Sequence, residues 1–373
     1  MRSFTLICFS LYFIQCYLEE KRYSPSWKYY YNLSNLVIAR NINYRCYTYH
    51  SDYIVCPNVF THKEYDNERI SLILHISSDH NINDIENHLK NYEGPISLGI
   101  FMKSSFSNKK QNLEIYKMLQ KYTRKYSKLS VHFIYKRVTK KSNYNLLDLA
   151  EYPINVIRNL ARRHSTTKYI LIADIDHMFS KNFESKMLKV AKVYLKSNYN
   201  NVLVYRIFEV DSTDLNRGPK NKKELKKLMN TNKASIFHPY NKKGHYIPYL
   251  NQWFNKKDTA NPGIQFEATY NRAQWEPQFV SLRNIPYHDE SFKYLLRDNM
   301  HLRWELCRAN YSFLVVNDVF MYHLGRKKRN EKKKIDYVRQ LLNGKNKYIM
   351  KKFESRMQKL YPKTKNKCPS IWV

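Results

Sequence analysis

Acidic residues, glycine and cysteine are all scarce in this chain. Its 373 residues include only 31 Asp and Glu against 65 Lys and Arg, which gives a formal net charge of +34, and they include 7 Gly and 6 Cys. Apolar residues nevertheless make up 43% of the sequence, which is enough for a substantial core in one large domain or two ordinary ones. The composition therefore argues against a mainly disordered basic protein.

The shortage of acidic residues leaves an excess of positive charge that indicates a polyanionic partner. Nucleic acid, an acidic membrane, and small molecules or glycans that carry phosphate or carboxylate would all fit. The same excess, together with many Asn, Tyr and Ile, is also what A/T-rich codons produce without selection. No nucleic-acid-binding motif is recognisable, so nucleic acid is the weakest of these partners.

The cysteines give little support to a zinc site, because no CxxC motif occurs and no His follows at zinc spacing. Apart from the two in the N-terminal segment, four Cys remain, an even number that suits disulfides in an oxidising compartment. Cys46 and Cys56 lie ten positions apart, which predicts a local disulfide loop. Cys307 and Cys368 are the remaining pair, and their disulfide would hold the C-terminal tail to the body.

Long apolar runs are absent after the N-terminus. Residues 4–18 form one apolar stretch between Arg2 and a charged segment, as in a secretory signal. The stretch is shorter than the ~20 residues that span a bilayer comfortably. Cleavage and retention as a short type II anchor are both open, and the lack of a clean small-x-small site favours the anchor. Sequons at Asn32 and Asn310 agree with exposure in the lumen.

Short apolar runs alternate with amphipathic segments from Ser71 onward. The expected strands are 71–77, 95–102, 129–137 and 168–176, and the expected helices are 83–92, 113–126 and 152–164. This alternation indicates an α/β layer architecture with a largely parallel sheet. The second half is less regular, with strands expected at 201–210 and 312–323 and helices at 221–230, 301–309 and 347–361. Asn310 follows a helix at a position that suits Asn in the left-handed conformation.

The pattern divides the chain into four expected segments. They are a signal peptide or short anchor at 1–18, a stem with a disulfide-stapled cap at 19–68, a catalytic domain at 69–361 and a C-terminal tail at 362–373. The helix at 347–361 has its apolar residues mostly on one face, so we expect it to dock on the body instead of forming a free basic arm.

Asp174 and Asp176 follow the apolar run at residues 169–173. In extended backbone, residues two apart point to the same face, so both carboxylates can reach one cation. Carboxylate oxygens suit Mg²⁺ or Mn²⁺, which can bridge a nucleotide diphosphate. Such a triplet is common by chance, but ligands of open α/β sheets bind at the carboxyl ends of strands, where this one falls. A calcium loop is excluded, because neither the loop Gly nor the terminal Glu follows at EF-hand spacing.

His323 ends the expected strand at 312–323 and is the best-placed imidazole of the second half to add a ligand. The alternative for a lone His at a strand end is a hydrogen-bonded structural residue. The residues alone favour that alternative.

Transfer of a sugar with inversion also needs a base that deprotonates the acceptor hydroxyl. His288, Asp289 and Glu290 form a compact polar cluster, and Asp298 follows eight residues after Glu290. We take Asp289, Glu290 and Asp298 as the catalytic candidates. A helix N-cap is an equally weighted alternative for Asp289, whereas a ligand-facing role is slightly favoured for Glu290.

Several segments, in order, resemble glycosyltransferase family 49, which contains β-1,4-glucuronyltransferase and the second catalytic domain of the LARGE enzymes. The resemblance covers roughly residues 71–361, and the ordered series is more specific than any single motif. The segments are YEGPISLGIFM (92–102), YPINVIRNLAR (152–162), YILIADIDHMFS (169–180), GHYIPYLNQW (244–253), WEPQFV (275–280), PYHDESF (286–292) and WELCRANYSFLVVNDVFMYH (304–323).

The resemblance implies a GT-A fold, a lumenal catalytic domain on a single-pass type II Golgi membrane protein, and an Mn²⁺-dependent inverting mechanism, with Mg²⁺ as the alternative ion. It implies UDP-glucuronate as donor and a glycan on a glycoprotein as acceptor. Carried over by position, Asp174 and Asp176 are the metal-binding pair and His323 the third ligand. The family usually continues its PxYDERF motif with Gly-Tyr-Gly, whereas here Phe292 is followed by KYLLRDNM and Ser291 replaces the Arg. Glycine lets backbone approach a ligand closely, so this departure bears on the acceptor and on activity.

We therefore expect a metal-dependent glycosyltransferase that moves glucuronate from UDP-glucuronate to a glycan hydroxyl in the secretory pathway. The alternatives are a transferase for another UDP-sugar, such as xylose or N-acetylglucosamine, and an inactive glycan-binding protein of the same fold. Secretion is the alternative to the Golgi membrane, and nucleic acid is not expected as a partner.

Overall fold

The computed structural model describes residues 46–62, 66–103, 109–137, 152–239, 241–294, 296–326 and 331–372. The expected signal or anchor at 1–18 and the expected stem up to residue 45 lie outside the described residues. Across the described ranges, no helix combines the length and the apolar character that crossing a membrane requires.

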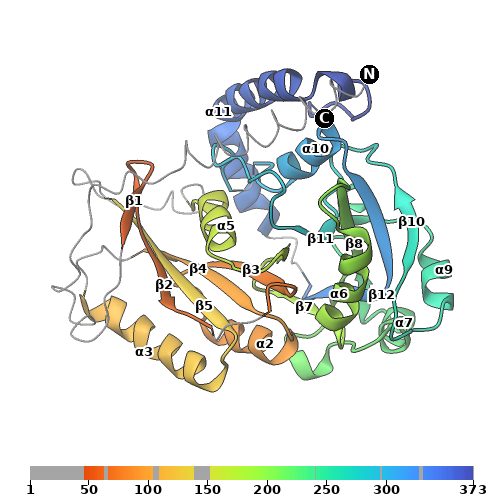
Figure 1. The fold of residues 1–373 in the computed structure, drawn as a ribbon, viewed down its shortest axis with the longest axis horizontal. Coiled ribbons are helices and arrows are strands. Elements are labelled where there is room, and N and C mark those ends of the chain that lie inside the picture. The colour runs from red at the N-terminus through yellow and green to blue at the C-terminus, as the bar shows by residue number, and fades with distance from the viewer. Residues whose placement is uncertain are drawn as a thin grey trace.

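The strands form one mixed sheet in the order β1-β2-β5-β4-β3-β6-β11-β8-β12-β10, with β7 paired to β12 and β9 to β8 (Figure 1). Their bounds are β1 (Tyr47–Tyr49), β2 (Tyr53–Phe60), β3 (Ile70–Ser77), β4 (Ile96–Met102), β5 (Leu129–Lys136), β6 (Tyr169–Ile172), β7 (His177–Phe179), β8 (Asn201–Val210), β9 (Ala234–Ile236), β10 (Ile264–Ala268), β11 (Gln278–Leu282) and β12 (Ser312–Leu324).

Parallel pairing is confined to two blocks of this sheet. Strands β5, β4, β3 and β6 run parallel to one another, and so do β8 and β12. Between the blocks lies β11, which is antiparallel to both β6 and β8. The expected α/β architecture with a mixed sheet is confirmed, and the start of β11 comes to lie beside the end of β6.

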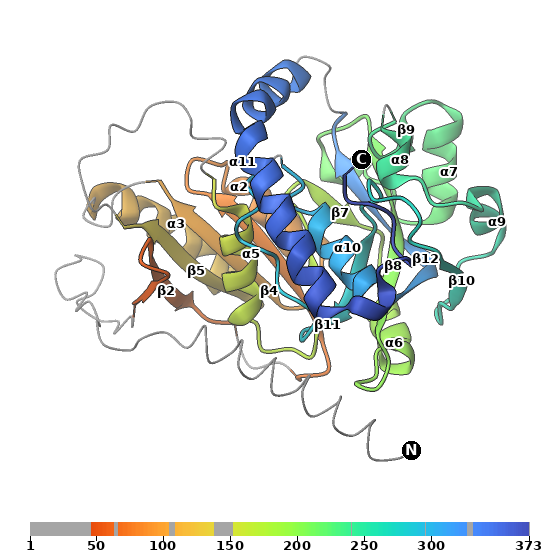
Figure 2. The ribbon, with the colours of Figure 1, turned by 90° about the horizontal axis from the view of Figure 1, so that it is seen from above.

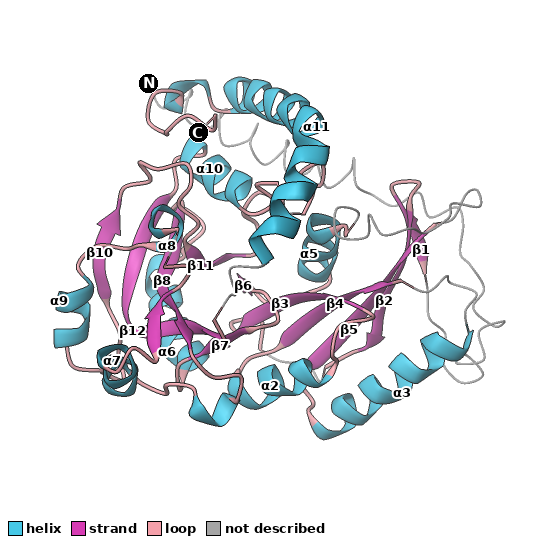
Figure 3. Cartoon of the chain, turned by 180° about the vertical axis from the view of Figure 1, so that it is seen from behind, coloured by secondary structure: helices cyan, strands magenta, loops and turns pink. Residues whose placement is uncertain are grey.

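Helices cover both faces of the sheet, with α2, α3 and α6 on one side and α5, α10 and α11 on the other (Figures 1 and 3). The helices are α2 (Asn83–Asn91), α3 (Lys109–Lys125), α5 (Ile154–Arg163), α6 (Phe183–Tyr194), α7 (Lys222–Asn230), α8 (Lys242–His245), α9 (Leu250–Asn255), α10 (Met300–Arg308) and α11 (Glu331–Leu360), with short 3₁₀ turns η3 (Leu215–Arg217) and η4 (Pro362–Thr364).

Both predicted disulfides, Cys46–Cys56 and Cys307–Cys368, are confirmed. The first joins β2 to the residue before β1, and β2 pairs with β5. The described part of the expected cap is therefore an edge hairpin of the same sheet. The second disulfide ties the C-terminal tail to α10.

Helix α5 packs unusually close to the sheet. A Cβ at Gly99 of β4 would lie 2.5 Å from Cγ2 of Ile157 and 3.2 Å from its carbonyl oxygen, so glycine is required for this approach. The helix is buried along almost its whole length, including Asn155, Arg158, Asn159 and Arg162. Buried polar side chains need hydrogen-bond partners, and those of α5 reach into the candidate site.

The C-terminal helix docks as expected. Met350, Phe353 and Met357 of α11 are buried in a core cluster shared with α10, and Figure 2 shows α11 running over α10. Asn310, which follows α10, adopts the left-handed conformation with a φ of 63°, so that prediction is also confirmed.

Candidate active site

Asp174 and Asp176 lie in a tight turn between β6 and β7. Strand β6 ends at Ile172, and the backbone N–H of His177 donates to the carbonyl oxygen of Asp174 at 3.2 Å. The expectation of extended backbone through both Asp residues was therefore wrong. The turn, which we call the acidic turn (residues 174–177), still gathers their carboxylates, because it folds the chain back at the end of the strand.

Two antiparallel strands bring a pair of histidines to this turn. β7 pairs with β12, and the register sets His177 directly opposite His323. Their ring centroids are 5.9 Å apart. The sequence pattern indicated His323 but not His177, although His177 directly follows the Asp-Ile-Asp triplet. Alternation of side chains could not indicate it, because the turn reverses the direction of the chain.

The backbone carbonyl of Gly325 orients the His323 ring toward Asp176. Its Nδ1 lies 2.7 Å from the carbonyl oxygen of Gly325, which only accepts hydrogen bonds, so Nδ1 carries a proton. Nε2 lies 2.8 Å from Oδ2 of Asp176. A backbone carbonyl that fixes one ring nitrogen and leaves the other facing a carboxylate is the arrangement that metal-binding histidines commonly use.

The acidic turn fits a divalent cation. Asp174, Asp176 and His177 each offer a ligand atom, and these atoms all lie within 4.8 Å of one another. Oδ1 of Asp176 is buried and accepts no hydrogen bond from the described residues, a costly situation that a bound cation would relieve. Two carboxylates with imidazole nitrogen suit Mn²⁺ well, since carboxylates favour Mn²⁺ and Mg²⁺ and imidazole favours transition metals.

Both carboxylates of the turn are held in the anionic form. Burial raises the pKa of Asp174, but the hydrogen bond from His75 and the charges of nearby His177 and Arg158 outweigh it and hold this pKa well below its usual range. Burial likewise opposes ionisation of Asp176, yet the hydrogen bond from His323 and the charge of His177 lower its pKa. Both groups can therefore bind a cation without first losing a proton.

Arg158 connects the acidic turn to one of the catalytic candidates. Its guanidinium lies 3.2 Å from Oδ1 of Asp174 and 3.1 Å from Oδ2 of Asp298, and the arginine is only 3% exposed. Asp298 therefore belongs to the site, but its carboxylate faces a permanent cation. Asp174 also lies 3.2 Å from Nε2 of His75, whose Nδ1 in turn lies 3.0 Å from the Tyr152 hydroxyl.

Asp289 and Glu290, the other two catalytic candidates, have partners outside the acidic turn. Asp289 accepts hydrogen bonds from the backbone and hydroxyl of Ser291 at 2.9 and 2.5 Å and pairs with Arg356 of α11 at 2.8 Å. Burial raises the pKa of Asp289, but the charges of Arg356 and His301 and the hydrogen bonds from Ser291 together outweigh it and lower this pKa. Asp289 is therefore not the helix N-cap that was weighed as its alternative, since Asn299 stands at the N-cap of α10. Its role is a local turn and an ion pair.

Glu290 has partners from two distant segments. Its Oε1 accepts from the Tyr49 hydroxyl and the Asn159 amide, both at 2.8 Å, and its Oε2 lies 3.1 Å from Nε2 of His50. Within the described ranges, neither this carboxylate nor that of Asp289 hydrogen-bonds to the acidic turn. The two residues fasten the 286–292 loop to α5, α11 and the edge hairpin.

The chain is similar in sequence to known glycosyltransferases. The family model "Glycosyl-transferase for dystroglycan" matches residues 134–362. Beta-1,4-glucuronyltransferase 1 of Danio rerio is 27% identical over 231 residues, which cover 61% of this chain and 52% of that protein. Xylosyl- and glucuronyltransferase LARGE2s of Danio rerio is 25% identical over 289 residues, which cover 75% of this chain and 35% of that protein. The chain thus spans about half the length of these relatives, or less.

Solved structures give a weaker likeness. The crystal structure of GalNAc-T7 with UDP, GalNAc and Mn²⁺ superposes with a TM-score of 0.39 at 11% identity, over 72% of this chain and 47% of that chain.

Proposed function

The chain belongs to this glycosyltransferase family, whose model matches more than half of it, and we propose that it transfers glucuronate from UDP-glucuronate to a glycan hydroxyl with the help of a divalent cation. The arrangement of Asp174, Asp176, His177 and His323 at the carboxyl end of β6 carries the proposal. Ligands of open α/β sheets bind at that edge. The relatives named as glucuronyltransferases support the choice of donor.

Each residue of the site has a part in this reaction. The two carboxylates of the acidic turn and the two histidines would hold the cation, which when bound offsets the charge that grows on the departing diphosphate. Arg158 and His75 hold Asp174 through its Oδ1. Asp176 is fixed by His323. Anionic ligands that are held in place need no reorganisation when the donor arrives.

A panel of UDP-sugars tests the function. The purified full chain is incubated with Mn²⁺, each donor and a set of acceptor glycans, and UDP release is measured. We expect release with UDP-glucuronate that depends on the acceptor. Turnover with UDP-xylose or UDP-N-acetylglucosamine alone would contradict the donor assignment. If every donor fails while glycans still bind, the chain is an inactive glycan-binding member of the family.

We further propose that the catalytic part faces the lumen of the Golgi, on a protein held in the membrane by its N-terminal segment. Two disulfides suit an oxidising compartment, and the apolar stretch at 4–18 resembles a secretory signal. A mass measurement on the membrane-bound or secreted product distinguishes anchoring from cleavage.

The role of His323 can be tested by replacement with Ala. Loss of a nitrogen that faces the acidic turn is expected to weaken Mn²⁺ activation, with the half-saturating concentration rising by roughly 10–100-fold. His80 provides the control, since it is a half-exposed histidine before α2 that pairs with Asp84 of that helix. Mn²⁺ is titrated against UDP release and against direct binding. If His323→Ala and His80→Ala respond to Mn²⁺ alike, His323 is only a structural residue.

A further inference from the structure

The three catalytic candidates expected from the sequence are all held by other residues. Deprotonation of the acceptor hydroxyl requires a base with an available lone pair. Asp298 faces Arg158, Asp289 faces Arg356, and both oxygens of Glu290 are engaged. Carboxylates that are paired with a guanidinium are weak bases, because the cation stabilises the deprotonated form.

The antiparallel register of β11 brings another carboxylate to the acidic turn. Val280 lies opposite Leu171 and Leu282 opposite Tyr169. Because the two strands run in opposite directions, residues just before β11 lie beside residues just after β6. Glu276 stands two positions before β11 and therefore next to the acidic turn. Residues 275–280 contribute to the family resemblance, which assigns Glu276 no role.

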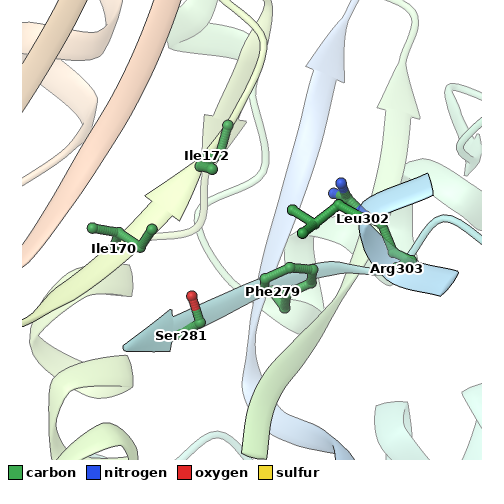
Figure 4. Close-up of a pocket in the computed structure, with 6 residues that line it drawn as sticks. All are labelled: Ile170, Ile172, Phe279, Ser281, Leu302 and Arg303. Carbon is green, nitrogen blue, oxygen red and sulfur yellow. The ribbon is translucent and has the colours of Figure 1, made fainter. Parts of the chain in front are cut away.

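The backbone around Glu276 is fixed on both sides. The N–H of Glu276 donates to the carbonyl oxygen of Gly244 at 2.8 Å. The carbonyl oxygen of the following residue, Pro277, accepts from Nε of Arg303 in α10 at 3.2 Å. Arg303 also lines a cavity between β6, β11 and α10, whose other lining residues are Ile170, Ile172, Phe279, Ser281 and Leu302 (Figure 4). Glu276 is thus anchored at the border between the acidic turn and a largely apolar interior.

The Glu276 side chain is half-buried, and it makes no hydrogen bond or ion pair with the described residues. Charges face it from four elements: Arg303 on α10, Asp298 before α10, Asp174 after β6 and Arg158 on α5. Burial is the largest influence, and the two carboxylates add to it while the two arginines oppose it, which raises the pKa of Glu276 to about 7. Such a value is well suited to a general base near neutral pH.

We propose that Glu276 is the general base of the transfer, an inference that rests on the proposed function. An oxygen of the acceptor hydroxyl attacks the anomeric carbon of the UDP-sugar. The bond from that carbon to the diphosphate oxygen breaks, and its electron pair leaves with UDP. The hydroxyl proton passes to the Glu276 carboxylate, which later releases it to solvent. The structure assigns the candidates Asp289 and Glu290 to holding the loop, and Asp298 to holding Arg158.

Replacement of Glu276 by Gln tests this role, because it keeps the shape and removes the proton-accepting oxygen. Sugar transfer to the acceptor is expected to fall by about 10²–10⁴-fold, whereas UDP binding in the presence of Mn²⁺ changes by less than about 3-fold. In the parent, kcat/KM rises with pH through about 7, as Glu276 loses its proton, and in Glu276→Gln this limb disappears. Glu267→Gln, an exposed site on β10, is the matched control.

A second readout does not depend on activity. A carboxyl whose pKa is raised by folding stabilises the native state only while it is protonated, so its effect is lost as pH rises through about 7. Glu276→Gln is therefore expected to raise Tm at pH 8 more than at pH 5, whereas Glu267→Gln shows no such difference.

The outcomes separate the two proposals. If the parent transfers sugar and Glu276→Gln does so within about 5-fold with an unchanged pH profile, the base assignment is wrong and the proposed function stands. If the parent transfers no sugar from any UDP donor, the proposed function fails and the base role fails with it. Equal Tm differences at both pH values would contradict the raised pKa.

Discussion

Replacing Asp176 by Asn is expected to reduce sugar transfer by about 10²–10³-fold, the effect of removing one electrostatic element from a transition state. The change removes a full negative charge from the acidic turn while preserving the size of the side chain. Its buried Oδ1 has no hydrogen-bond partner among the described residues, so the activity loss should come from weakened cation binding. UDP release is measured across a range of Mn²⁺ concentrations, with Mn²⁺ binding measured directly by calorimetry.

Asp176 is a cleaner target than Asp174. Its hydrogen-bond partner in the fold is His323, whereas Asp174 holds both His75 and Arg158. The Asp176→Asn protein should therefore unfold within a few degrees of the parent, which separates loss of chemistry from loss of fold. Asp214→Asn, at an exposed turn before η3, serves as the control. Unchanged Mn²⁺ binding in Asp176→Asn would refute the proposed cation site.

Replacing Arg158 by Met is expected to lower the free energy of unfolding by about 3 kcal/mol. Met keeps the aliphatic stem but leaves Asp174 and Asp298 without the cation that lies 3.2 and 3.1 Å from them. Removing one partner of a fully buried ion pair typically costs about 3–5 kcal/mol. The value here lies at the lower end, because the Asp174 side chain is 47% exposed and keeps its contact with His75. Urea unfolding followed by tryptophan fluorescence measures the change.

Mn²⁺ gives this prediction a second test. The cation would offset part of the negative charge left by Arg158→Met, so adding Mn²⁺ should raise Tm more in the variant than in the parent. Arg326→Met, at an exposed position two residues after β12, should change neither quantity. A variant at Arg158 that unfolds like the parent would show that the guanidinium contributes no net stability to the site.

Local patterns predicted much of this fold because they record local physical chemistry. The apolar runs marked the strands β3 to β6, the left-handed Asn310 followed from its place after α10, and the two disulfides followed from an even set of Cys. The position of Asp174 and Asp176 after a buried strand also predicted their place at the sheet edge.

Pairings between distant segments were not visible in the sequence. Glu290 was expected to face a ligand, yet it is held by Tyr49, which lies 241 positions earlier, and by Asn159, which lies 131 positions earlier. His177 lies opposite His323 only because β7 pairs with β12. Glu276 lies near the acidic turn only because β11 lies between β6 and β8 in the sheet. Hydrophobic periodicity carries no information about which strands become neighbours.

The strand order also has a consequence for how the protein is made. The acidic turn is synthesised before its partners. His323 follows Asp176 by 147 positions, and Cys368 follows Cys307 by 61 positions. Contacts so far apart in sequence form slowly, after long loops have closed. A chain that stops before Cys368 therefore keeps a free thiol at Cys307, and one that stops before β12 lacks His323 at the acidic turn. If the acidic turn binds Mn²⁺ as proposed, tight binding and the loss of that thiol would together report that synthesis has passed Cys368 and that the sheet has closed.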